Sequence, residues 1–379
     1  ATVGRGRLLG PEELDRKNLA LFGRTWRQWR SGADPHQFSM RTALTGPQAD
    51  YKGFYGGIDG ATVTARNREF TALMSNLTES MATDLACQIV VQDFNRPQAE
   101  RKLFTLVDRT SVPGQLLNIQ KKLPGKVSDM DRLKTHTIRG QFAAAGGSVR
   151  FKVADLTRDA HRSVDDEWSA AALTVKTIVI RQGGRVVKTL NGSGLQYNAG
   201  FRVDVHTDDS GREHRRGDPE PGVGWRMHGG AWVEFTTRLA PGEYQLEAEL
   251  GTSLLSNNVN DAMSARIVIS AMENVDETDS GRLFRQQIAT LLEQALARPA
   301  SDATVAQLMG VLMESAGDAT DRGDWFFDQD SHCDTWSIWP GAELTHEENR
   351  VRYGDSEGMM RGWATLLHGV MTSWEYLHD

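Results

Sequence analysis

The turn YGGIDG at residues 55–60 is the first place where residue types and spacing could do chemistry. Adjacent glycines permit positive φ, and glycine-rich turns ahead of helices often cradle ligands. Neither the GKS or GKT of a phosphate-binding loop nor GxGxxG is present, so the turn does not predict nucleotide binding. Two interpretations stay open: a structural turn in which Asp59 or Thr62 caps the next helix, or a ligand-facing loop. The residues of that candidate loop are Tyr55, Gly56, Gly57 and Asp59.

A serine motif, GDSEG at residues 354–358, matches the GxSxG of a nucleophile elbow. Such an elbow needs its acid and its histidine later in the chain. Few residues follow it, and His368 lies in the helix that the same stretch begins, so it cannot fold back onto Ser356. We therefore interpret Asp355 or Ser356 as the N-cap of the last helix. No convincing acid–base or nucleophile set is found elsewhere, and whether the chain is an enzyme stays open.

Oxygen-rich residues gather in DQDSHCD, residues 328–334. This loop places Asp328, Asp330 and Asp334 close together, but it lacks the glycine at position 6 and the closing glutamate of an EF-hand loop. It is a weak calcium candidate. The histidines show no HxH or HExxH spacing, so no zinc is predicted.

Aromatic residues in the middle of the chain could stack against sugars, because an exposed aromatic face suits the apolar side of a pyranose. Packing inside a core is the alternative for each of them. The glycan-stacking candidates are Trp168, Tyr197, Trp225 and Trp232.

The elements that would position these residues change character along the chain. Residues 66–94 have apolar side chains at helical spacings of three and four, and the helical period returns after residue 271. Between residues 147 and 271 the period is two, with hairpin turns such as QGG at 182–184, which predicts antiparallel strands.

This pattern predicts an α+β multidomain chain. A helical region at 1–146 and another at 272–379 pack into one platform, since each strongly striped helix needs a partner. An antiparallel β-sandwich like a carbohydrate-binding module, residues 147–271, is inserted between them.

Composition narrows the function classes. The formal charge of −7 argues against general nucleic-acid binding, and no apolar run is long enough for a membrane span. Without CxxCH the chain does not attach haem covalently. Its two cysteines, Cys87 and Cys333, are either inert buried thiols or one disulfide.

Three stretches together resemble one protein family. RLLGPEELDRKNLALFG at 7–23 resembles that family's opening helix, and residues 51–94, from YKGFYGGID to ACQIVVQDF, resemble its YGGID block. MRGWATLLHGVMTSWEYLHD at 360–379 resembles its closing helix, although HGVMTSWEYL departs from the usual pattern there. The family is the group of secreted planctomycete cytochrome-c-like proteins, many of which carry a haem domain.

The resemblance implies export, with a periplasmic or extracellular location, and the N-terminal Ala is what cleavage after a small residue would leave. Cys87 and Cys333 fall on two cysteines of the family, and oxidising compartments keep disulfides, so we predict that they pair. Any haem would sit on a partner chain, because the cytochrome motif is missing here. No catalytic residue can be transferred.

The sequence thus predicts an extracytoplasmic, non-catalytic binding or assembly subunit. Its β-sandwich would bind a glycan or a partner protein, and it would hold no cofactor by itself apart from calcium. The alternative is a haem-free subunit of a cytochrome-linked periplasmic redox complex.

Overall fold

The computed structural model describes most of the chain. The described residues are 7–31, 38–45, 51–58, 69–124, 134–155, 171–191, 205–207, 213–215, 218–220, 224–227, 232–254, 262–321 and 357–378.

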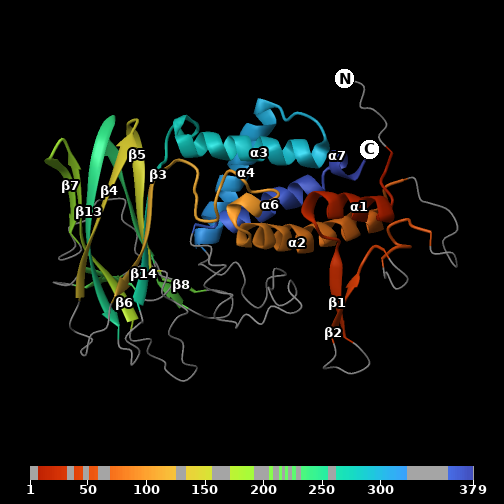
Figure 1. Ribbon diagram of the computed structural model, residues 1–379, viewed down its shortest axis with the longest axis horizontal. Coiled ribbons are helices and arrows are strands. Elements are labelled where there is room, and N and C mark those ends of the chain that lie inside the picture. The colour runs from red at the N-terminus through yellow and green to blue at the C-terminus, as the bar shows by residue number, and fades with distance from the viewer. Residues whose placement is uncertain are drawn as a thin grey trace.

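Helices from both ends of the chain form one unit, drawn at the right of Figure 1. Their bounds are α1 Pro11–Phe22, α2 Ala72–Asn95, α3 Asp279–Leu296, α4 Asp302–Asp321, α6 Met359–Met371 and α7 Trp374–Leu377, with short 3-10 turns at Gln98–Glu100 and Val275–Glu277. Local signals set these bounds: Pro11 opens α1, the hydroxyl of Thr278 accepts from the backbone of Gly281 at the start of α3, and Gly23 ends α1 with a φ of 72°.

The two chain ends are joined by polar contacts as well as by packing. The backbone N–H of Leu9 donates to the carbonyl of Leu377 at 3.0 Å. The ammonium of Lys17 donates to the carbonyl of Tyr376 at 2.7 Å, and the Tyr376 hydroxyl donates to the Asn18 side chain at 2.5 Å. The first and last helices therefore belong to one platform.

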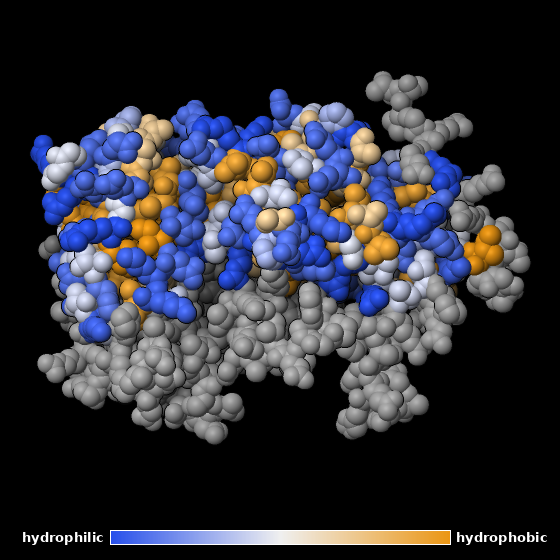
Figure 2. Space-filling view, viewed as in Figure 1, coloured by the Kyte–Doolittle hydropathy of each residue, from blue (hydrophilic) through white to orange (hydrophobic). Residues whose placement is uncertain are grey.

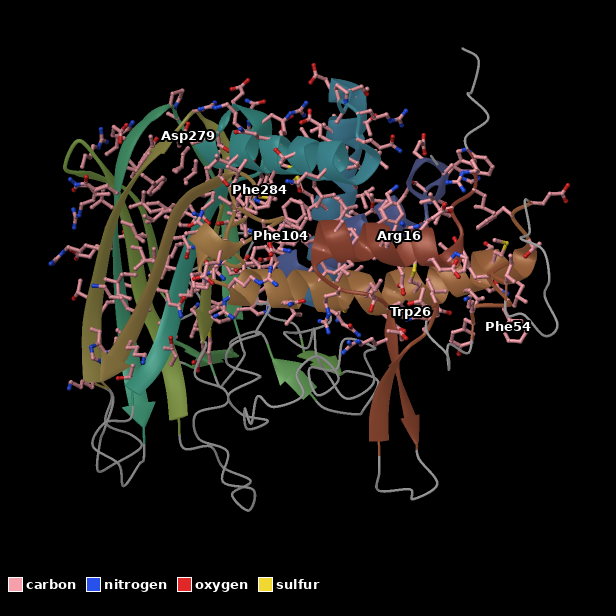
Figure 3. The ribbon with its side chains drawn as sticks, turned by 45° about the vertical axis from the view of Figure 1, so that its right-hand side comes forward. Arg16, Trp26, Phe54, Phe104, Asp279 and Phe284 are labelled. Carbon is pink, nitrogen blue, oxygen red and sulfur yellow. The ribbon has the colours of Figure 1, made fainter. Side chains whose placement is uncertain are left out.

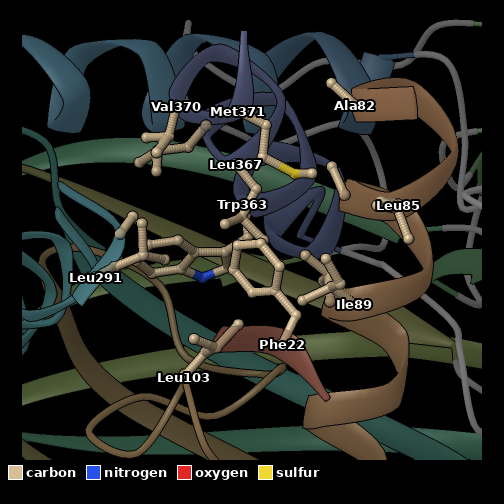
Figure 4. Close-up of a cluster of buried hydrophobic side chains, with 14 of the residues drawn as sticks. Phe22, Ala82, Leu85, Ile89, Leu103, Leu291, Trp363, Leu367, Val370 and Met371 are labelled. Carbon is tan, nitrogen blue, oxygen red and sulfur yellow. The ribbon is translucent and has the colours of Figure 1, made fainter. Parts of the chain in front are cut away.

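A single hydrophobic cluster fills this platform, and Trp363 of α6 lies in it with no exposed surface. Its ring centre is 5.0 Å from that of Phe104 and 5.7 Å from that of Phe284 in α3. Figure 4 shows side chains of α2, α3 and α6, such as Ile89, Leu291 and Leu367, converging on the same indole.

The β unit contains two larger antiparallel sheets that share a second cluster of buried side chains. One runs β10-β11-β6-β13-β4, with β7 also paired to β6, and the other runs β12-β5-β14-β3. The strands of the first are β4 Lys134–Ala144, β6 Ala171–Gln182, β7 Arg185–Asn191, β10 Asp218–Glu220, β11 Gly224–Met227 and β13 Gly242–Leu254. Those of the second are β3 Gln115–Pro124, β5 Gly147–Asp155, β12 Trp232–Leu239 and β14 Ala262–Ala271. Two small hairpins complete the described strands: β1 Arg27–Ser31 with β2 Phe38–Thr42, and β8 Val205–Thr207 with β9 Glu213–Arg215.

The second sheet lies beside the helices and the first forms the outer layer, as Figure 1 shows. On the face drawn in Figure 2, hydrophilic residues predominate over both units and hydrophobic ones gather in separate patches. The helical unit thus rests on one sheet and leaves the other facing away.

The α+β prediction is confirmed, with two differences in detail. The β unit begins at β3 rather than at residue 147, because β3 pairs with β14 and β4 pairs with β13. Residues 115–124 include two adjacent lysines, and their apolar and polar residues do not alternate regularly. The sequence therefore did not predict this strand at the edge of a sheet. The N-cap of α6 is Gly358, with a φ of 67°, rather than Asp355 or Ser356, which lie outside the described residues.

Candidate functional site

Alternation along β5 places charged side chains between the two units. Phe151 and Val153 belong to the cluster inside the β unit, so Arg150 and Lys152 point to the opposite face of the sheet, toward the helices. Arg266 of the neighbouring β14 lies opposite Ala154 and shares that face.

These cations meet Glu357, the residue just before Gly358 and α6. Lys152 Nζ lies 3.5 Å from Glu357 Oε1, and Arg150 Nη2 lies 3.4 Å from Glu357 Oε2. The side chains of Lys152 and Glu357 are each 1% exposed, so this pair is removed from water. Arg150 is partly exposed and also approaches Glu234 at 3.9 Å.

Neighbouring groups fix the other two cations. The Lys152 ammonium sits 4.6 Å from the ring centre of Trp232, a cation–π distance. Arg266 Nε donates to the side chain of Asn118 at 3.1 Å, and its Nη2 donates to the carbonyl of Thr110. The cluster is therefore held rigidly by both sheet and loop.

The charge state of Glu357 follows from two opposing effects on its pKa. Burial is the largest and by itself raises the pKa, but Lys152, Arg266 and Arg150 together outweigh it and hold the pKa below its usual value. The carboxylate stays ionised at neutral pH, where it can accept hydrogen bonds but cannot act as an acid.

A pocket of about 170 Å³ opens beside this cluster, between β14 and the helices α4 and α6. Its polar wall is formed by Arg150, Ser270 and Glu357. Its apolar wall is formed by Val112, Pro113, Ala271, Met272, Met313, Ala316 and Met359. A lining that is mainly apolar with a few convergent polar groups is typical of small-molecule sites, and a volume of about 170 Å³ suits only a small ligand.

Tyr55, Gly56 and Gly57 of the YGGIDG turn are buried, whereas Ile58 is exposed. Tyr55 is 1% exposed, and burial raises the pKa of its hydroxyl to about 12. Gly56 has a φ of 80°, and a Cβ on Gly57 would come within 2.7 Å of Pro11 and 2.8 Å of Lys52. The side chain of Tyr55 therefore faces the helices, and Asp59 lies outside the described residues.

The described glycan-stacking candidates are buried as well. Trp225 is 3% exposed and Trp232 is 5% exposed, and neither presents the open ring face that a sugar needs. Both are packing residues, which was the alternative interpretation, because they lie on the covered faces of β11 and β12. Trp168 and Tyr197 lie outside the described residues.

Cys87 is buried in α2, and its thiol is not free. Cys333 lies outside the described residues, so their pairing stays a prediction. The calcium candidates Asp328, Asp330 and Asp334 lie outside them too. Within the described ranges, no group of three or more His, Cys, Asp or Glu side chains is placed to hold a metal ion.

Sequence patterns alone did not predict a role for Arg150, Lys152, Arg266 and Glu357. The available signal was the alternation of SVRFKV, which puts two cations on one face of a strand. Pairing them with a glutamate some 200 positions later requires the fold, because nothing local links the two stretches.

No protein-family model matches this chain, and no curated protein does. Among the helices that the structure describes, none combines the length and the apolar character that crossing a membrane demands.

Proposed function

We propose that the chain is a non-catalytic binding or assembly subunit that works outside the cytoplasm and takes a small anionic ligand in the pocket between its two units. Its β unit would be an antiparallel β-sandwich of the carbohydrate-binding-module type. The observation that carries the proposal is Arg150, a partly exposed cation in the pocket wall, in a cluster where three cations meet the carboxylates of Glu357 and Glu234.

The surplus of positive charge indicates the sign of the ligand. Lys152 and Arg266 are buried. Arg150 is partly exposed, although it pairs with Glu357 and Glu234, so it is the cation of this cluster that a ligand can reach. Arginine presents a planar fork of donors that matches a carboxylate with two hydrogen bonds. The Ser270 hydroxyl adds a donor on the same wall.

The rest of the pocket indicates the body of the ligand. Its apolar wall includes three methionines, whose flexible side chains adapt to irregular apolar shapes. A carboxylate with a short apolar chain would therefore place its charged end at Arg150 and its chain along Met272, Met313 and Met359.

Binding rather than turnover is the role that these groups support. General acid catalysis needs a group that holds a proton near the working pH. Glu357 is kept ionised by its cations, and Lys152 is enclosed between Glu357 and the ring of Trp232. The cluster joins the two units and shapes a pocket without supplying a proton.

A macromolecular partner, glycan or protein, stays part of the proposal, and any haem would sit on another chain. The resemblance of both chain ends to secreted proteins supports the location. The burial of Trp225 and Trp232 favours a protein over a glycan, because their rings are covered.

The test starts from the full chain purified from its own cell envelope without denaturation. Native mass spectrometry is expected to show a bound small acid, released when Arg150 is changed to Gln. A retained protein chain with a Soret absorption band would support the cytochrome-linked alternative instead. The masses of the two chains are compared after correction for the substitution. If wild type carries no more bound mass than Arg150→Gln, ligand binding in the pocket is contradicted.

A further inference from the structure

A second cationic site lies far from the pocket wall, in the connection between α1 and β1. Trp26, with no exposed surface, anchors this connection: its indole N–H donates to Asp84 of α2 at 2.8 Å, and its ring stacks on Tyr51 at 5.3 Å. Figure 3 shows Trp26 at the root of the hairpin beside α2, with Arg16 on the neighbouring helix. Arg24, two residues before Trp26, is thereby held close to α2.

The guanidinium of Arg24 is mostly buried, and its Nη1 atom has no hydrogen-bond partner within the described residues. Other cations surround it. Arg27 and Arg96 act on it electrostatically, and Lys102 Nζ would lie 3.3 Å from a Cβ on the adjacent Gly23. Burial, followed by the repulsion from Arg27 and Arg96, lowers the pKa of Arg24 to about 10.

Attraction to the negative, C-terminal end of the α2 dipole does not explain why these cations gather around Arg24. Cations near a helix C-terminus are stabilised when they approach its last carbonyls. Arg101 takes that role here, because its Nη2 donates to the carbonyl of Phe94 and its Nε to that of Arg96.

Asp93, the carboxylate that pairs with Arg96, already has other hydrogen-bond donors. Asp93 accepts backbone N–H bonds from Lys102, Leu103 and Phe104 at 2.8–2.9 Å, and Arg96 approaches it at 3.5 Å. Its two oxygens are thereby engaged away from Arg24. A buried guanidinium nitrogen without a hydrogen-bond partner is costly, which indicates that a ligand supplies the partner.

We propose that Arg24, Arg27, Arg96 and Lys102 form a binding site for a phosphate or sulfate group. A tetrahedral oxyanion accepts several donors at once, and arginine clusters bind such groups with short, charge-assisted hydrogen bonds. The buried Nη1 of Arg24 supplies a fixed inner donor, while the exposed side chains of Arg27 and Lys102 complete the outer wall. The same chemistry serves a free inorganic ion or an esterified group on a larger molecule.

Thermal unfolding of the full chain tests the site with inorganic phosphate and sulfate as probes, against chloride at equal ionic strength. Wild-type protein is expected to gain several degrees in Tm at millimolar phosphate, because a ligand that binds the folded state stabilises it. Arg24→Met removes the inner donor and is expected to lose that gain. Arg16→Met, a change of the same type on the exposed face of α1, is the matched control and keeps it.

The chloride buffer distinguishes a binding role from a structural one. Arg24→Met is expected to match or exceed the wild-type Tm there, because it removes a buried charge that is repelled by its neighbours. A large fall in Tm in chloride overturns the proposal, as does an equal gain in Tm of wild type and Arg24→Met from the oxyanion that stabilises wild type. Lys102→Met, which keeps the backbone bond to Asp93, is expected to weaken phosphate binding several-fold without changing Tm in chloride; no weakening contradicts the site.

Phenyl phosphate separates the two sources. Stabilisation by both phosphate and phenyl phosphate assigns the site to a free or terminal group, whereas stabilisation by phenyl phosphate alone assigns it to an esterified ligand. Stabilisation by neither overturns the proposal.

Discussion

Glu357 is the residue on which the cluster between the helical and β units depends, because its carboxylate meets three cations. We call this cluster of Arg150, Lys152, Arg266 and Glu357 the junction cluster. Changing Glu357 to Gln leaves Lys152 and Arg266 buried without their counter-charge. Removing one partner of a buried ion pair costs about 3–5 kcal/mol. We expect a loss of that size in the free energy of unfolding measured with urea.

The matched control is Glu247→Gln on the outer sheet, where the partner Arg139 is exposed and the pair lies 2.9 Å apart. Exposed pairs contribute about 0–1 kcal/mol, so little change is expected. Equal effects of Glu357→Gln and Glu247→Gln would show that the junction cluster does not hold the units together.

The same residue predicts how stability depends on pH. The pKa of Glu357 is lower in the folded chain than the usual value of 4.5, so the unfolded chain takes up a proton first as the pH falls. Its contribution is therefore complete above pH 4.5 and is lost as the pH falls from there through the folded pKa. Wild type should lose more stability than Glu357→Gln over that range in urea unfolding at a series of pH values; parallel curves would contradict the assignment.

Among the structural elements, the turn at residues 51–57 is predicted to act by packing closely against α1. A methyl group on Gly57 would meet Pro11 at 2.7 Å and the carbonyl of Lys52 at 2.8 Å, so Gly57→Ala should push the turn off α1. Overpacking of this kind costs about 1–3 kcal/mol. Gly310→Ala in α4, where a Cβ meets nothing within 4 Å, should instead stabilise by about 0.5–1 kcal/mol. Differential scanning calorimetry measures both, and a neutral Gly57→Ala would contradict a packed turn.

Elements with a strong local period could be predicted from the sequence, and those that depend on distant partners could not. The stripe around Met74, Leu85 and Ile89 predicted α2, and alternation predicted β5 and β14. The edge strand β3 was missed because Lys121 interrupts the apolar series of Leu117, Ile119 and Leu123. The candidate site was missed for a related reason: Lys152 and Glu357 meet only after both units have folded.

In the whole molecule, non-covalent contacts hold the two chain ends and the β unit together. The predicted Cys87–Cys333 disulfide would add a covalent link. In the unfolded chain, this disulfide would close the long loop between residues 87 and 333, which would stabilise the fold by up to about 5 kcal/mol. Peptide mapping without reductant should yield the two cysteines in one linked peptide, and dithiothreitol should lower Tm. Two titratable thiols in the unfolded, unreduced chain would contradict the disulfide and weaken the support for a location outside the cytoplasm.

Isothermal titration with octanoate tests whether the pocket between the two units takes a small anion through Arg150. Octanol and octylamine have an eight-carbon chain too, but carry a neutral hydroxyl or a cationic ammonium in place of the carboxylate. Arg139→Gln is a control on the outer sheet. We expect octanoate to bind more tightly than octanol, and octylamine to bind most weakly. Arg150→Gln should weaken octanoate binding by about tenfold, and Arg139→Gln should leave it unchanged. Equal binding of the three compounds, or an unchanged affinity in Arg150→Gln, would contradict anion binding through Arg150.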